Sequence, residues 1–324
     1  MNLENRFDQT FVAKDNNLKY SFELKDVKTI LNKRKGERSL FIGDYSLNPY
    51  MGCSFDCSYC YVNGSKYANK TSSLIVKSNA YELVKAQLKN KAKHGERAII
   101  NLGTATDCYM SIERELGLTR DILKIINRFR FSVHIITKSD LILRDIDILK
   151  KIQKSAILPG DVKCEDNTIK SIITFSFSTT DDEIAKIFEY NAPRPSKRLK
   201  IVDKLKKEGF LVGVALMPIL PFISDDEDCL NKIFSDFKKH DVDHVLHGSL
   251  TLFGDKNTHS KVRYLNLLKE NYPELYDKTS KIFGEKNYLS KNYQEKLNKR
   301  VHKIANDFSI KTSIISQYFK KDII

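Results

Sequence analysis

The chain has 324 residues, and 41% of them are hydrophobic, which is enough for a sizeable packed core and argues against general disorder. The N-terminus lacks the apolar stretch of a signal peptide, and no later run approaches the ~18–20 apolar residues of a membrane span. We therefore expect a soluble, cytoplasmic protein with no membrane partner.

The net charge is +14, from 55 basic and 41 acidic residues. An excess of this size is typical of proteins that bind a polyanion such as nucleic acid. However, Lys supplies 42 of the basic residues and Arg only 13, and Arg is the better sign of selected phosphate recognition. The charge therefore leaves two explanations open, a nucleic-acid partner or a compositional bias toward Lys.

The first 38 residues are polar and charged, so we expect 1–38 to be a lead-in segment rather than a domain. A first strand is expected around Leu40–Leu47. From Ala98 onward, short apolar runs rich in β-branched residues alternate with segments of helical periodicity. These runs are Ala98–Thr106, Ser132–Thr137, Ser171–Ser178, Leu211–Leu220 and His244–Leu252. Such alternation predicts βα units and a parallel sheet.

Counting the first strand, residues 39–254 hold about six βα units. A complete eight-unit barrel needs roughly 250 residues, and only 215 lie from 40 to 254. We therefore predict an α/β fold with an incomplete (β/α)6 TIM-like barrel over 39–254. The remaining segment, 255–324, is predicted to be a basic, tyrosine-rich helical extension, because 256–303 contains twelve Lys or Arg against five Asp or Glu.

Three of the six cysteines, Cys53, Cys57 and Cys60, fall within eight residues with the spacing C-x3-C-x2-C. A disulfide framework is typical of short, cysteine-dense secreted chains, which this chain is not. Thiolates are the ligands of iron–sulfur clusters. A structural zinc site needs four protein ligands, and the next candidate, His94, is far along the chain. Three cysteines on a 4Fe–4S cluster leave one iron open for a ligand.

With an aromatic residue, Tyr59, just before the third cysteine, this motif resembles the signature of radical S-adenosylmethionine (SAM) enzymes. The resemblance implies that Cys53, Cys57 and Cys60 hold a 4Fe–4S cluster, that the open iron binds SAM, and that Tyr59 lies beside the adenine. One electron, from a partner such as flavodoxin or ferredoxin, then cleaves SAM to methionine and a 5′-deoxyadenosyl radical. A zinc loop or a coincidence of three thiols is the alternative.

A longer resemblance covers roughly residues 40–255. The strings SLNPYMGCSFDCSYCY, GTATD, ITKS, FSFST, FEYNAPRPSKRL and PILP follow in the order seen in the spore photoproduct lyase-like group, which is often labelled DNA repair photolyase. Each string alone is weak, but their order is specific. The resemblance implies a lyase-like enzyme that acts on nucleic acid, in DNA repair or modification.

Several of these strings lie at the carboxyl ends of predicted strands, where the active sites of α/β barrels collect. The resemblance implies that Thr106, Lys138 and Ser176 contact polar groups of SAM. Gly103, Thr104 and Asp107 belong to the same predicted cofactor-binding set. Thr106 and Ser176 are equally explained as ordinary strand-end hydroxyls, and Asp107 as a helix cap. Lys138 is harder to explain otherwise, because a Lys that ends an apolar strand must reach a polar cavity.

Other polar residues carry two explanations each. Glu189 and Arg198 either pair to shape the site or are solvated helix charges. His244 and His247 flank the sixth predicted strand, where a core or surface role is favoured over contact with substrate. We interpret Cys164 and Cys229 as incidental.

Cys108 is a candidate catalytic residue. The resemblance implies that in a spore photoproduct lyase in the strict sense a cysteine three positions before the strand-end Asp donates hydrogen to the product radical. Here that position is Thr104, whose hydroxyl holds its hydrogen too tightly for this step. Cys108 lies four residues after Thr104, about 13 Å further along an extended strand. It is therefore either a buried loop cysteine or, if the chain folds back, the hydrogen donor.

Three functions follow from the sequence. The leading one is a radical SAM enzyme acting on nucleic acid. The second is a radical SAM enzyme that modifies a peptide or small metabolite, and the third is a non-catalytic metal-binding protein.

Overall fold

The computed structural model describes residues 22–35, 41–68, 73–160, 162 and 170–315, together with the backbone of two short strands, β1 (Ala13–Asp15) and β2 (Leu18–Tyr20). Its main sheet has the strand order β12-β11-β10-β9-β8-β5-β4. The pairs from β5 to β12 are parallel, and only the edge pair β4·β5 is antiparallel. The strands are β4 (Asn32–Lys33), β5 (Tyr45–Leu47), β8 (Ile99–Leu102), β9 (Ser132–Thr137), β10 (Ser171–Phe177), β11 (Leu211–Ile219) and β12 (Val245–Ser249).

Six parallel strands confirm the predicted α/β architecture. Among the described residues β5 and β12 do not pair with each other, so the barrel is incomplete. All six residues of β9 are buried, as expected where helices and core cover both faces of a parallel sheet.

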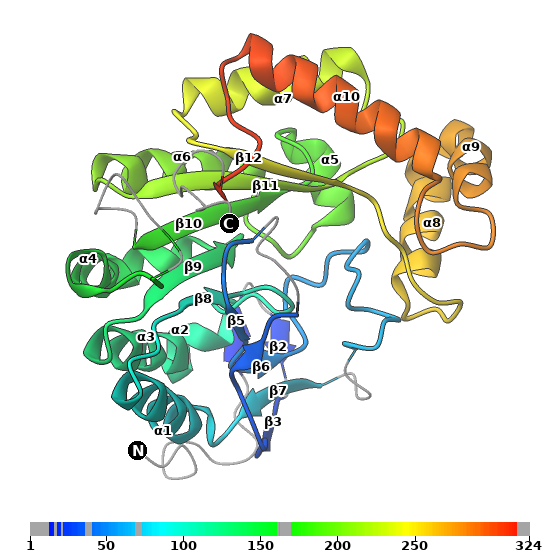
Figure 1. Ribbon diagram of the computed structural model, residues 1–324. Coiled ribbons are helices and arrows are strands. Elements are labelled where there is room, and N and C mark those ends of the chain that lie inside the picture. The colour runs from blue at the N-terminus through cyan, green and yellow to red at the C-terminus, as the bar shows by residue number, and fades with distance from the viewer. Residues whose placement is uncertain are drawn as a thin grey trace.

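Helices cover the outer face of this sheet (Figure 1). They are α1 (Ala80–Lys93), α2 (Ile112–Leu116), α3 (Leu118–Arg128), α4 (Ile146–Ser155), which follows a short 3₁₀ turn (Asp140–Asp145), α5 (Asp182–Phe188), α6 (Pro195–Lys207) and α7 (Glu227–Lys239). In α3, a stripe of Ile122, Leu123, Ile125 and Ile126 is buried, which explains why this segment forms an amphipathic helix. The Asp181 side chain caps α5 by accepting hydrogen bonds from the backbone N–H groups of Glu183 and Ile184.

A second, three-stranded sheet lies beside the barrel, with the order β3-β7-β6. Its strands are β3 (Phe22–Lys25), β7 (Leu74–Lys77) and β6 (Tyr50–Met51). Part of the predicted lead-in segment therefore joins sheets, because β3 pairs with β7 and β4 extends the main sheet. The predicted domain limits, 1–38, 39–254 and 255–324, stay predictions.

The C-terminal extension is helical, as predicted. Its helices are α8 (Ser260–Asn271), α9 (Pro273–Phe283) and α10 (Lys291–Asp307). Helix α10 packs on α7, whereas α8 and α9 lie on the opposite side of the molecule from α1, α3 and α4 (Figure 1). No helix in the described part of the chain is long and apolar enough to cross a membrane.

Candidate functional site

A cavity of about 500 Å³ opens at the carboxyl ends of the parallel strands. Its walls come from the cysteine loop that follows β6 and from the ends of β8, β9, β10, β11 and β12. The lining includes Cys53, Cys57, Tyr59, Cys60, Gly103, Thr104, Thr106, Asp107, Lys138 and Ser176. The structure therefore brings together every predicted cofactor-binding and metal-ligating residue in one place.

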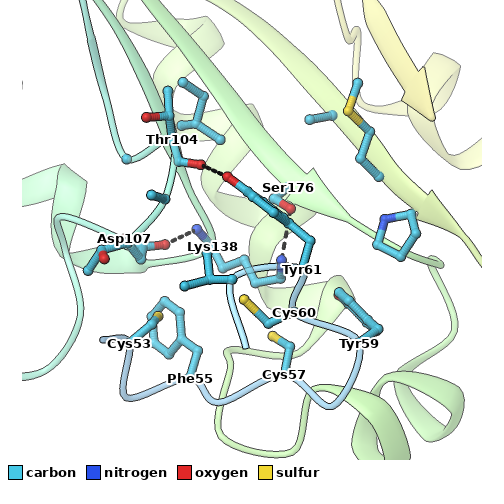
Figure 2. A pocket seen from close by; sticks show the side chains of 18 of the residues that line it. Cys53, Phe55, Cys57, Tyr59, Cys60, Tyr61, Thr104, Asp107, Lys138 and Ser176 are labelled. Atoms are coloured by element: carbon cyan, nitrogen blue, oxygen red, sulfur yellow. Dashed lines mark hydrogen bonds between the residues drawn. The ribbon is translucent and has the colours of Figure 1, made fainter. Parts of the chain in front are cut away.

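The three cysteines lie on one short loop, and their sulfurs point into the cavity (Figure 2). Two turns fold this loop: the Asp56 N–H donates to the Cys53 carbonyl at 3.2 Å, and the Cys60 N–H donates to the Cys57 carbonyl at 3.0 Å. Within the described residues, no three His, Cys, Asp or Glu side chains are grouped tightly enough for one metal ion. A 4Fe–4S cluster does not need such a group, because each cysteine binds a different iron.

Burial of the three sulfurs disfavours free thiolates, so thiolates at this site need a positive partner. Burial raises the pKa of the Cys53 thiol to about 12, and it raises the pKa values of Cys57 and Cys60 as well. Hydrogen bonds from the backbone N–H groups of Phe55 and Asp107 to Cys53 oppose this rise. Bound iron would supply the missing positive charge, and N–H groups aimed at sulfur are a usual feature around such clusters.

On the opposite wall, Lys138 follows β9 and is buried, with 9% of its surface exposed. Its ammonium donates to the Ser176 hydroxyl at 2.8 Å and lies 5.9 Å from the centre of the Tyr59 ring (Figure 2). The charge of Lys138 also opposes the rise in the pKa of Cys57. A cation therefore faces the cysteine loop across the cavity, where it can meet an anionic group of a ligand.

Asp107 organises the neighbouring strand ends. Its carboxylate accepts hydrogen bonds from the Thr137 hydroxyl at 2.8 Å, from the Lys138 backbone N–H at 2.7 Å and from the Tyr109 N–H at 2.9 Å. Burial raises the pKa of Asp107, although these donors oppose the rise. The carboxylate holds the loops after β8 and β9 together and still lines the cavity.

Gly103 permits the close approach of these two strand ends. Its backbone φ of +84° is one that residues other than glycine rarely adopt. An added Cβ would lie 2.0 Å from the Ile136 carbonyl oxygen. Any other residue would push β8 away from β9 at the cavity wall.

A buried ion pair supports the site from behind. Arg198 and Glu189 are both fully buried and in contact, so they pair instead of being solvated helix charges. Glu189 also accepts hydrogen bonds from Tyr59 and from Ser178, and Arg198 donates to the Ser176 carbonyl at 2.8 Å. The pair therefore links the cysteine loop to the end of β10.

Not every sequence candidate reaches the cavity. Cys108 is fully buried in the hydrophobic core and is not among the described residues that line the cavity. His244 is buried next to Gly213, and His247 contacts the His302 ring edge-on; neither lines the cavity. Cys229 lies on α7, away from the cavity. Cys164 lies outside the described residues.

Several lining residues were not predicted from the sequence. Met217 lies two residues before the end of β11, Ser249 ends β12, and Thr251 follows β12. The strand-end rule that selected Lys138 also pointed to them. Asp56, within the cysteine loop, and Tyr61, directly after Cys60, also line the cavity. Nothing in their residue types or spacing marked them as site residues.

Comparisons with known proteins agree with this geometry. The Radical SAM superfamily model matches residues 47–233. An uncharacterized protein of Methanocaldococcus jannaschii is 30% identical over 251 residues, which is 76% of this chain and 83% of that one. An uncharacterized protein of Mycobacterium tuberculosis is 23% identical over 264 residues, 79% of this chain and 72% of its own.

The fold resembles that of spore photoproduct lyase. A variant of that enzyme solved with bound AdoMet and dinucleoside spore photoproduct has a TM-score of 0.64 at 14% identity, over 89% of this chain and 79% of that one. A structure of spore photoproduct lyase complexed with dinucleoside spore photoproduct gives the same values.

In this incomplete parallel barrel, the cysteine loop faces polar residues at the strand ends. This arrangement defines an iron–sulfur enzyme site. The chain belongs to the radical SAM superfamily. Its cofactors are accordingly a 4Fe–4S cluster and SAM.

Proposed function

We propose that this radical SAM enzyme acts on nucleic acid, in repair or modification, with Cys53, Cys57 and Cys60 as the cluster ligands. When bound, the cluster supplies the electron that cleaves SAM and yields the 5′-deoxyadenosyl radical. A low-potential donor of the flavodoxin or ferredoxin class would supply that electron in the cytoplasm.

The protein residues orient SAM and exclude water. Lys138, held by Ser176, is suited to the SAM carboxylate, because a buried ammonium is stabilised by an opposite charge. Tyr59, fixed by Glu189, presents its ring to the cavity for the adenine, and the polar groups of Gly103, Thr104, Thr106 and Asp107 complete the binding wall.

The observation that carries the nucleic-acid proposal is an exposed aromatic pair at the mouth of the cavity. Tyr61 lines the cavity, and 41% of its surface is exposed. Tyr67 is 57% exposed and contacts the Tyr61 ring edge-on, with 6.5 Å between the ring centres. The ammonium of Lys66 lies 5.2 Å from the centre of the Tyr67 ring. Exposed rings with an adjacent cation suit an unstacked base and its phosphate. The dinucleoside ligand of spore photoproduct lyase supports the same substrate class.

The reaction differs from that of spore photoproduct lyase in its hydrogen donor. Thr104 stands at the position that the resemblance assigns to the donor cysteine, and its carbonyl accepts a hydrogen bond from the Tyr61 hydroxyl at 2.8 Å. Among the described lining residues, the only cysteines are Cys53, Cys57 and Cys60. We therefore propose a reaction that needs no thiol from the protein at this step.

Two measurements test the nucleic-acid proposal. Affinity for a single-stranded oligonucleotide should fall linearly on a log–log plot as salt rises from about 50 to about 200 mM. The reconstituted, anaerobic enzyme should also make more 5′-deoxyadenosine from SAM when DNA is added. A flat salt dependence with DNA-independent turnover would contradict the proposal and favour a peptide or small metabolite as substrate.

A further inference from the structure

The C-terminal extension makes a direct contact with the cysteine loop. From α8, the Arg263 guanidinium donates to both carboxylate oxygens of Asp56, at 2.7 and 2.8 Å, and to the Asp56 backbone carbonyl at 3.1 Å. The two residues are 207 positions apart in the chain. A bidentate pair with an additional carbonyl contact fixes both the side chain and the backbone of Asp56.

Asp56 occupies a position where the backbone needs support. It lies between Cys53 and Cys57, with a φ of +44°, in the left-handed region that non-glycine residues seldom adopt. This conformation turns the chain between the first and second cysteines. The direction in which Cys53 and Cys57 face depends on it.

The N-terminus of α8 contacts the segment that follows the three cysteines. The Ser260 N–H donates to the Asn63 carbonyl at 3.2 Å, and the Ser260 hydroxyl accepts from the Phe253 N–H at 2.9 Å. At Gly64 the φ is +93°, and an added Cβ would lie 2.8 Å from the Phe253 carbonyl oxygen, so the two segments are in close contact. Arg263 therefore projects from a helix whose first residue is hydrogen-bonded to the segment after the cysteines.

We propose that Arg263 is a positioning residue for the iron–sulfur cluster, acting through Asp56. The extension is then part of the cluster site, although it lies outside residues 47–233 that match the family. Because Asp56 neutralises the Arg263 charge, the pair acts on the geometry of the three thiolates. The inference rests on the proposed role of Cys53, Cys57 and Cys60 as ligands.

The test compares the rate at which reconstituted variants lose iron to a chelator, together with the paramagnetic spectrum of the reduced cluster with and without SAM. R263A should lose iron about 10- to 100-fold faster than the wild type, the usual effect of removing support from a metal ligand. R263K, which keeps the charge but loses the bidentate geometry, should lie between the two. The control is K303A, which removes another ion pair of the extension, Lys303 with Glu227 on α7, and should behave as the wild type.

A double-variant comparison isolates the route through Asp56. D56G allows the positive φ but removes the carboxylate, so R263A added to D56G should cause little further acceleration of iron loss. Amide hydrogen exchange of residues 53–60 in the cluster-free protein should also be faster in R263A than in K303A. If R263A does not fold, the test uses R263K, and iron loss faster than in the wild type supports the proposal.

Wild-type iron retention and an unchanged spectrum in R263A, or in R263K if only that variant folds, would overturn the proposal. So would a full R263A effect in the D56G background. If C57A retained its cluster, the ligand assignment itself would fail, so the two failures are distinguishable.

Discussion

The Lys138 ammonium donates to the Ser176 hydroxyl at 2.8 Å, across the carboxyl ends of the neighbouring strands β9 and β10. This contact holds a buried cation over the cavity, opposite the cysteine loop. The backbone N–H of Lys138 also donates to the Asp107 carboxylate. Both the backbone and the ammonium of Lys138 are therefore hydrogen-bonded.

We therefore expect Lys138→Ala to weaken SAM binding while iron content is unchanged. A lost hydrogen bond to a charged group is worth about 1.5–3 kcal/mol, or roughly 10- to 150-fold in affinity. Anaerobic calorimetry on iron-loaded protein measures this, with Lys197→Ala, an exposed ion-pair partner of Asp140, as the control. Unchanged SAM affinity in the iron-loaded variant would make Lys138 a structural residue.

The Glu189–Arg198 pair should dominate the stability of the region behind the site. Arg198→Met leaves a buried carboxylate without its partner, so the free energy of unfolding should fall by about 3–5 kcal/mol. Lys150→Ala, which removes the surface pair with Glu208, should cost less than about 1 kcal/mol. Urea unfolding of both variants checks the contrast, and equal losses would argue against it.

The same pair gives a pH dependence. Burial by itself raises the pKa of Glu189, but Arg198, Lys138 and the Tyr59 and Ser178 hydroxyls outweigh it and lower the pKa to about 2. An unfolded Glu titrates near ~4.3, so ionised Glu189 stabilises the fold fully above that pH and less as the pH falls toward 2. The stability difference between the wild type and Glu189→Gln should therefore be constant from pH 7 to about 5 and shrink below about 4. A difference that does not change with pH would contradict the pKa shift.

Much of this arrangement could be predicted from sequence. The run Ser132–Thr137 is β9 residue for residue, because a strand buried on both faces is rich in β-branched residues and lacks a clear alternation of apolar and polar positions. The order of strands then placed Lys138 and Ser176 at the same end of the sheet. The sixth strand is shorter than predicted, Val245–Ser249 instead of His244–Leu252, because Leu250 and Leu252 are buried in the hydrophobic core after the pairing with β11 has ended.

Other features depend on contacts that no local pattern records. Glu189 and Arg198 had two explanations in the sequence, and only burial by the surrounding packing decides between them. Strand β4 is two exposed residues at a sheet edge, too short for a periodic signal. Arg263 meets Asp56 across 207 positions, and nothing near either residue indicates the other.

Cys108 should be dispensable for cleavage of SAM. It is fully buried in the core, so Cys108→Ala removes a small side chain there and should retain both iron and 5′-deoxyadenosine formation. We also expect little or no repair of the spore-type thymine dimer by the wild-type enzyme. Efficient repair that is lost in Cys108→Ala would instead identify Cys108 as the hydrogen donor.

The tyrosine pair and its lysine should affect nucleic-acid binding in different ways. Tyr61→Ala with Tyr67→Ala should weaken binding of a single-stranded oligonucleotide by about 1–3 kcal/mol per stacked base, with little change in the salt slope. Lys66→Ala should reduce the slope by about 1. Fluorescence anisotropy across a salt series measures both quantities, with Tyr190→Phe as an exposed aromatic control. Wild-type affinity in the double variant would remove the support for a base-stacking site.

We propose that the cysteine loop holds the cluster that cleaves SAM. The most direct measurement is 5′-deoxyadenosine formation by anaerobically reconstituted protein, with iron and sulfide determined on the same samples. We expect the wild type and Cys229→Ala to retain a 4Fe–4S cluster and form the product, and Cys57→Ala to lose most of its iron and form none. Formation of 5′-deoxyadenosine by Cys57→Ala at the wild-type rate would contradict the assignment of the cluster ligands.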